Sequence, residues 1–133
     1  MNESPAVGGK QLWAGRILSG LPALFLLIDG IMKLIKPDFV VQATVQLGYP
    51  EGVIVGLGVV LTSCTAVYLI SRTAVLGAIL LTGYLGGAVA THVRVGSDWF
   101  SILFPIMLGV LLWGGLWLRD YGLRCVLPWR SQS

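Results

Sequence analysis

Asp29 and Lys33 are the residues whose types and spacing point most directly to chemistry. They stand four positions apart in a long apolar stretch, so a helix places both on one face, with the acid before the base. An ionisable group at the middle of a membrane helix costs about 2.5 to 3.5 kcal/mol, and such groups often carry function. Two interpretations follow: an internal ion pair whose lysine reaches toward the membrane surface, or groups that handle a proton or a ligand.

His92 is the sole histidine of the sequence, and Arg94 follows it closely. An imidazole exchanges protons near neutral pH, and a guanidinium binds anions, so together they can hold an anion or a quinone carbonyl. Tyr84 precedes His92 by two helical turns and can reach the same place. The simpler interpretation makes His92 a hydrogen-bonded helix end. The functional hypothesis is a shared cleft at one end of the protein, formed by Asp29, Lys33, Tyr84, His92 and Arg94, with Glu51 and Asp98 nearby.

Other kinds of site find little support in the sequence. One histidine with scattered carboxylates matches no metal-ligand spacing, so no metal site is expected. No phosphate loop, nucleophile elbow or dinucleotide fingerprint is present. Cys64 and Cys125 are expected to be unpaired because they fall at different depths of the expected fold.

The chain that must position these residues is unusually apolar. Of its 133 residues, 56% are hydrophobic and 11% are charged, whereas about a quarter are charged in a soluble domain. So few charges cannot cover a surface in water, and we expect a lipid bilayer to surround the protein. The cations flank apolar stretches and form no basic run, so no nucleic-acid partner is expected.

Four apolar runs are long enough to cross a bilayer, which takes about 20 residues in a helix. They cover residues 12–35, 52–70, 73–92 and 100–118. Lipid cannot satisfy backbone hydrogen bonds, so each run is expected to be a helix, and short connections make neighbours antiparallel. The predicted fold is all-α, a single domain over residues 1–133 that forms a membrane-spanning antiparallel four-helix bundle. A short interfacial helix is expected near residues 39–41.

Small residues recur at four-residue intervals in the third expected span. Gly83 and Gly87 belong to one row, and Gly86 belongs to the row beside it. Small residues let membrane helices approach closely. We therefore predict that these three glycines pack against neighbouring helices and that this span is the most enclosed of the four.

The distribution of cations predicts the orientation. With four spans both termini lie on one side, which holds six cations: Lys10, Arg16, Arg72, Arg119, Arg124 and Arg130. The other side holds three, Lys33, Lys36 and Arg94. Because cation-rich loops remain in the cytoplasm, we expect a multi-pass protein of the bacterial inner (plasma) membrane with both termini cytoplasmic.

Four segments of the sequence stand out together: RTAVLGAILLTGYLGGAVATHVRVG at residues 72–96, DGIMKLIKP at 29–37, LGYP at 47–50 and WGGLWLRD at 113–120. These segments resemble DoxX-like membrane proteins. The resemblance covers nearly the whole chain and implies a four-helix membrane bundle. Two departures stand out: Ser71 replaces the proline of many relatives, and the span at 52–70 lacks the carboxylate that many relatives carry. Asp29 and His92 therefore remain as candidates for handling protons.

The resemblance leaves the function open, including whether the protein is an enzyme. The related DoxD type is associated with thiosulfate:quinone oxidoreductase, which implies redox or thiol chemistry and makes quinone the candidate cofactor. One hypothesis is an accessory or small-ligand-binding membrane subunit with a membrane or redox protein as partner. A second is the catalytic subunit of a quinone-linked oxidoreductase. A third is a homo-oligomeric transporter or channel, because four short helices enclose little space.

Overall fold

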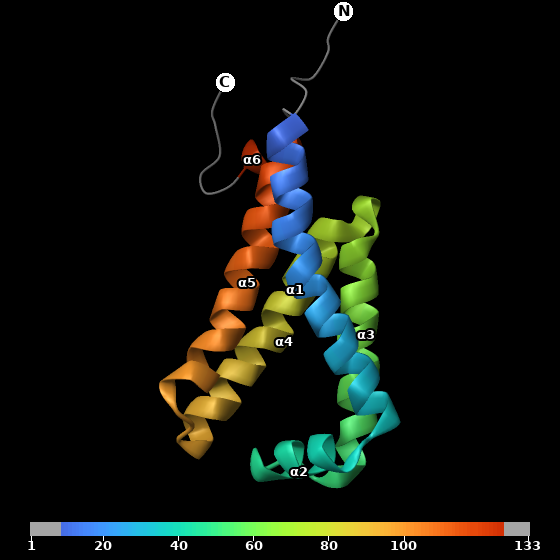
Figure 1. Cartoon of the computed structure of the whole chain (residues 1–133), viewed down its shortest axis with the longest axis vertical. Coiled ribbons are helices and arrows are strands. Elements are labelled where there is room, and N and C mark those ends of the chain that lie inside the picture. Colours follow the sequence, from blue (N-terminus) through green and yellow to red (C-terminus); the bar gives the residue numbers. More distant parts are fainter. Residues whose placement is uncertain (1–8, 127–133) are drawn as a thin grey trace, which may run out of the picture.

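The computed structural model describes residues 9–126, and all regular elements in that range are helices (Figure 1). The long helices are α1 (Gly9–Ile35), α3 (Ile54–Leu69), α4 (Ala74–Val95) and α5 (Trp99–Arg119). The short ones are α2 (Asp38–Gln46), α6 (Tyr121–Arg124) and the 3-10 helices η1 (Glu51–Val53) and η2 (Ser71–Thr73). The all-α prediction is confirmed. Arg130 lies outside the described residues.

Within residues 9–126, four segments are long and apolar enough to cross a membrane. They are Gly9–Ile35, Glu51–Leu69, Ser71–Val95 and Trp99–Arg119. These bounds agree closely with the four spans predicted from hydropathy. The short helix expected near residues 39–41 is also present, as part of α2.

The four long helices pack in a ring. α1 contacts α3 and α5, and α4 contacts the same two neighbours. In Figure 1, the start of α1 and helix α6 lie at one end of the molecule, and α2 crosses the opposite end. Toward α2, the helices α1 and α3 diverge from α4 and α5 (Figure 1). We call the two ends of the bundle the α6 end and the α2 end.

The tightly packed core lies nearer the α6 end. Tyr68, Leu81, Leu112 and Leu116 are each at most 1% exposed. The Tyr68 hydroxyl donates a 2.6 Å hydrogen bond to the Leu112 carbonyl oxygen and so joins α3 to α5. A buried hydroxyl needs such a partner, and this bond fixes the position of α3 relative to α5 along their lengths.

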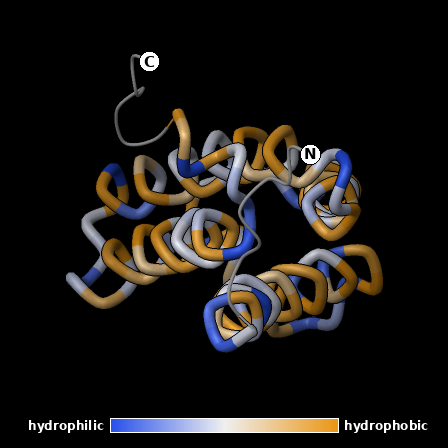
Figure 2. The backbone as a smooth tube through the Cα atoms, turned by 90° about the horizontal axis from the view of Figure 1, so that it is seen from above, coloured by the Kyte–Doolittle hydropathy of each residue, from blue (hydrophilic) through white to orange (hydrophobic). Residues whose placement is uncertain are grey.

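The outside of the bundle is apolar as well. Leu21 on α1 is 65% exposed and Val110 on α5 is 64% exposed. Hydrophobic residues predominate along the helices when the molecule is viewed along its long axis (Figure 2). A continuous apolar exterior on long helices suits lipid as the surrounding solvent.

The predicted packing of Gly83, Gly86 and Gly87 is wrong within this chain. A Cβ atom built on any of these glycines meets no other atom within 4 Å. The reason is that Gly83 and Gly87 line one cavity and Gly86 lines another, so the small residues leave space. The expectation that α4 is the most enclosed span is also wrong. In each of the four spans, 28% of an 18-residue apolar stretch is buried.

Other glycines bring the helices together. A Cβ atom on Gly115 of α5 would lie 2.5 Å from the Ser19 backbone nitrogen of α1. A Cβ atom on Gly58 of α3 would lie 2.9 Å from the Gly30 carbonyl oxygen of α1. Gly77 of α4 lies directly against the Tyr68 backbone of α3. These close approaches place the four helices and thereby shape the spaces between them.

Candidate functional site

A cavity of about 430 Å³ lies between the diverging helices, toward the α2 end. All four long helices and α2 contribute to its wall. Phe25, Leu57 and Phe104 supply apolar surface. The polar lining residues are Asp29 and Lys33 on α1, Thr44 on α2, Tyr49 in the following turn, and Tyr84, Thr91 and His92 on α4. We call this space the polar cavity.

Asp29 and Lys33 form an ion pair in its wall. The Lys33 Nζ donates a 2.7 Å hydrogen bond to Asp29 Oδ2, one helical turn away. The Lys33 side chain is 14% exposed and that of Asp29 is 37% exposed. Within residues 9–126, Asp29 Oδ1 has no hydrogen-bond partner in the protein. The pair lowers the cost of placing two charges in a membrane helix and leaves one carboxylate oxygen for a ligand.

Tyr84 and His92 bring two protonatable groups to the same cavity. Among the described residues, the Tyr84 hydroxyl has no hydrogen-bond partner. The His92 imidazole bonds Ser97 Oγ through Nδ1 at 2.9 Å, which fixes the ring at the end of α4. Nε2 of that ring has no partner in the part of the chain described. Both side chains can therefore bond a molecule in the cavity.

A hydrogen-bond relay fastens the turn after α2 to α4. The Thr91 hydroxyl donates to the Gly87 carbonyl oxygen at 2.8 Å, so its single proton is used. The 2.7 Å contact between the Tyr49 and Thr91 hydroxyls is then donated by Tyr49. This relay holds the segment that closes the α2 end of the polar cavity.

Arg94 lies outside the polar cavity. Its guanidinium packs over Gly48, where a Cβ atom would lie 2.6 Å from Nη2. Gly48 has a φ of 96°, a conformation that other residues rarely adopt. Arg94 thus covers the turn that carries Tyr49 and does not contribute to the cavity wall.

Glu51 and Asp98 also lie away from the cavity lining. Glu51 forms a 3.8 Å ion pair with Lys36. Asp98 precedes α5 and accepts a 2.7 Å hydrogen bond from the Ser101 hydroxyl, which lowers the pKa of the Asp98 carboxyl. The structure therefore gathers Asp29, Lys33, Tyr84 and His92, and leaves Arg94, Glu51 and Asp98 apart.

Three polar lining residues escaped the sequence analysis as site residues: Thr44, Tyr49 and Thr91. Thr44 belongs to α2, and nothing local in the sequence shows that α2 folds across the cavity. Thr91 continues the row of Gly83 and Gly87, which was interpreted as packing. The sequence signal that could have indicated a polar-lined space is that the row of small residues Gly83 and Gly87 continues with the hydroxyl of Thr91.

Metal ligation finds no support in the described residues. Residues 9–126 contain no group of three or more His, Cys, Asp or Glu side chains placed to hold a metal ion. Cys64 on α3 is partly buried, Cys125 is exposed, and both are free thiols.

Four apolar helices around a cavity lined by ionisable groups define a small multi-pass membrane protein. Residues 17–115, which include both partners of the ion pair as well as Tyr84 and His92, match the DoxX-like family. The chain belongs to the DoxX-like family, as the four sequence segments predicted. Comparisons with curated proteins and with solved structures gave no match.

Proposed function

We propose that this protein is a small-ligand-binding membrane subunit linked to redox or thiol chemistry, with the polar cavity as its site. One observation carries the proposal: a Tyr84 hydroxyl, a His92 nitrogen and an Asp29 oxygen, none with a hydrogen-bond partner within residues 9–126, belong to residues that line one cavity of about 430 Å³. Ligand sites typically measure about 300 to 1,000 Å³ and combine apolar walls with a few polar groups.

The lining selects a ligand with an apolar body and a carbonyl or hydroxyl group. Phe25, Phe104 and Leu57 offer apolar contact. Tyr84 can donate to a carbonyl oxygen, and Asp29 can accept from a hydroxyl. A quinone headgroup has this chemistry, and quinone is the cofactor that the DoxD resemblance implies.

A catalytic subunit of a quinone-linked oxidoreductase is the second candidate. It is favoured by the presence of His92 and Tyr84 in one cavity, because both groups can transfer a proton to a carbonyl. Such a role requires a membrane or redox protein partner to deliver electrons. An oligomeric transporter receives less support, because Tyr68, Leu81 and Leu112 fill the bundle nearer the α6 end.

Ligand binding can be tested with a short-chain ubiquinone analogue added to the purified protein in lipid nanodiscs, using calorimetry. We expect saturable binding that weakens at least about fivefold in Tyr84→Phe, since a lost hydrogen bond to a ligand is worth about 1 kcal/mol or more. Tyr121→Phe is the matched control, because Tyr121 is 41% exposed and lies outside the polar cavity. Absence of saturable binding, or equal binding by both variants, contradicts the quinone assignment.

The catalytic candidate predicts a further result in native membranes that contain the partner protein. With a thiol or thiosulfate reductant, the spectrum of the added quinone should shift to that of the quinol, and His92→Asn should slow the shift. Binding without any such shift favours the accessory role. Ion flux in proteoliposomes that is lost in Asp29→Asn favours the transporter role instead.

We further propose that the protein lies in the bacterial inner membrane with both termini in the cytoplasm. Arg16, Arg72, Arg119 and Arg124 belong to the α6 end, whereas Lys36 and Arg94 belong to the α2 end. A membrane-impermeant maleimide applied to intact spheroplasts should label a Ser97→Cys variant that also carries Cys125→Ser. It should label native Cys125, which is exposed, only after permeabilisation. The reverse pattern contradicts this orientation.

A further inference from the structure

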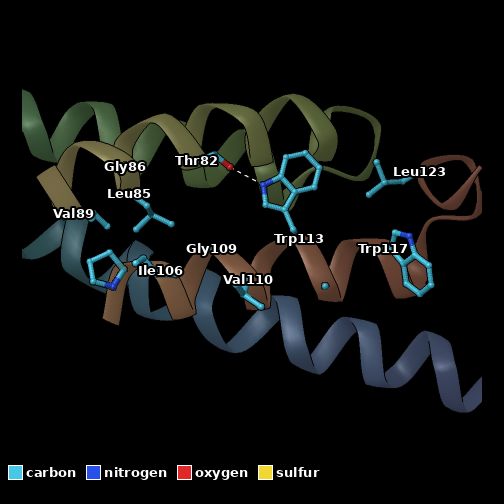
Figure 3. Close-up of a pocket in the computed structure, with 12 residues that line it drawn as sticks. Thr82, Leu85, Gly86, Val89, Ile106, Gly109, Val110, Trp113, Trp117 and Leu123 are labelled. Carbon is cyan, nitrogen blue, oxygen red and sulfur yellow. Dashed lines mark hydrogen bonds between the residues drawn. The ribbon is translucent and has the colours of Figure 1, made fainter. Parts of the chain in front are cut away.

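A second hollow, of about 660 Å³, lies between α4 and α5 (Figure 3). Its walls include Leu85, Val89, Ile106 and Val110. The Trp113 indole N–H donates to the Thr82 hydroxyl at 2.6 Å, so these two polar groups satisfy each other (Figure 3). We call this hollow the apolar groove, because its walls suit a hydrocarbon chain far better than a polar ligand.

Three glycines keep the groove open. Gly86, Gly109 and Gly114 line it, and a Cβ atom on Gly86 or Gly114 would meet nothing within 4 Å. On Gly109 the nearest contact would be Leu85 Cδ1 at 3.7 Å. The space therefore exists because side chains are missing at these positions.

One end of the groove lies beside an arginine. Trp117 and Leu123 line this end (Figure 3). The Arg124 guanidinium carbon lies 5.6 Å from the centre of the Trp117 ring and 5.8 Å from that of Tyr121. Its Nε is buried and has no hydrogen-bond partner among residues 9–126. No acidic side chain in that range forms an ion pair with Arg124.

We propose that the apolar groove is a binding site for an anionic phospholipid, with one acyl chain along α4 and α5 and the phosphate on Arg124. A chain-shaped hollow that ends at a cation near the membrane surface complements both parts of such a lipid. Arginine binds phosphate oxygens through its planar fork of N–H groups, and stacking on Trp117 and Tyr121 holds that fork in place. Basic pockets between membrane helices recognise lipid headgroups in this way.

A second copy of the chain suits the groove less well. At the α6 end, the acidic residue among those described is Asp120, and its Oδ1 already accepts the Leu123 backbone N–H at 3.1 Å. A second copy would therefore bring apolar side chains to the groove but could offer Arg124 only the second oxygen of a carboxylate that already caps α6 in its own chain. A phospholipid supplies both an apolar chain and a free anion.

Quenching of tryptophan fluorescence by brominated acyl chains tests the site. A variant that keeps the two groove-lining tryptophans, Trp113 and Trp117, with the other tryptophans replaced by phenylalanine, is reconstituted in phosphatidylcholine vesicles. Dibrominated phosphatidylglycerol or dibrominated phosphatidylcholine is then added as an increasing fraction of the lipid. We expect Trp113 and Trp117 to be half-quenched at an about fivefold lower fraction of the anionic lipid than of dibrominated phosphatidylcholine. The reason is that one cation near the headgroups provides about 1 kcal/mol of binding free energy.

Two pairs of variants separate the headgroup from the chain. Arg124→Gln should abolish the preference for the anionic lipid. Arg72→Gln, at an exposed arginine of the same end, should leave that preference unchanged. Gly86→Leu should fill the groove and reduce quenching by both lipids. Gly56→Leu, at an exposed glycine outside both hollows, should not. Gly86→Leu changes no charge, so it tests the site even if Arg124→Gln fails to fold.

Two results would overturn the proposal. In the first, the two brominated lipids quench Trp113 and Trp117 equally, and Arg124→Gln does not change the quenching by either lipid. This result indicates ordinary boundary lipid. The other is a lack of quenching of Trp113 and Trp117 by either lipid, together with disulfide-linked dimers of a Val110→Cys variant that also carries Cys125→Ser, which indicates that a second copy covers the groove.

Discussion

The Tyr49 hydroxyl donates a 2.7 Å hydrogen bond to the Thr91 hydroxyl and so ties the turn after α2 to the last turns of α4. The two residues are 42 positions apart and both line the polar cavity. Within the described chain, α2 has few contacts with the long helices, chiefly with α1. The bond therefore controls how firmly the α2 segment covers the cavity.

Tyr49→Phe should loosen this cover without unfolding the bundle. A hydrogen bond of this kind contributes about 1 kcal/mol, so local opening should become about fivefold more frequent. Hydrogen exchange followed by mass spectrometry in nanodiscs should show faster exchange in residues 38–48 and unchanged exchange in α3. Tyr121→Phe serves as the control. Unchanged exchange in α2 would show that the relay does not hold the cover.

Removal of one member of the Asp29–Lys33 pair should cost more stability than removal of both. Asp29→Asn leaves the Lys33 ammonium, 14% exposed, without its partner, and Lys33→Met leaves the carboxylate alone. The pair is partly exposed, so we expect a coupling of about 1 to 2 kcal/mol in a double-mutant cycle. Reversible unfolding in mixed micelles with increasing SDS measures it. Additive effects of the two changes would mean that the ion pair contributes nothing to the fold.

Glycines of two kinds should respond differently to alanine. Gly115→Ala places a methyl group 2.5 Å from the Ser19 nitrogen, so α1 and α5 must separate at a cost of about 1 to 3 kcal/mol. Gly83→Ala meets no atom within 4 Å and should be neutral or stabilising by up to about 1 kcal/mol, as alanine favours helix. The same unfolding assay compares the two. Equal destabilisation would show that Gly83 has a packing partner.

These glycines also show how far the sequence predicts the structure. Span positions follow from local hydropathy, and the Asp29–Lys33 contact follows from helix geometry, so both could be predicted. A row of small residues indicates that one helix face is narrow but does not indicate what lies opposite. At Gly77 and Gly115 it is a backbone, and at Gly83 it is a cavity, because the divergence of the helices depends on contacts distant in sequence.

The polar residues divide in the same way, into those whose position follows from local sequence and those whose position depends on contacts distant in sequence. Asp29, Lys33 and His92 were predicted to gather because they lie near the same end of the bundle, and Tyr84 because it lies two helical turns from His92 on the same span. Arg94 was grouped with them by depth alone, although its direction from α4 turns it toward Gly48. Thr44 could not be predicted, because its place in the cavity depends on the path of α2 beneath the bundle.

Asp98 provides a prediction about pH. The Ser101 hydroxyl donates to this carboxylate, so the pKa of Asp98 is lowered from its ordinary value of 3.8. A lowered pKa in the folded state means that the interaction stabilises the start of α5 fully above the ordinary value and is lost as the pH falls through the lowered one. NMR titration of a sample with labelled aspartate carboxyls should find Asp98 below 3.8, and Ser101→Ala should return it toward that value. An unchanged titration in Ser101→Ala would mean that the hydroxyl is not the cause. The side chain is exposed, so the effect should remain local: after correction for the intrinsic exchange rate at each pH, the first turn of α5 should lose protection in acid while α1 keeps it.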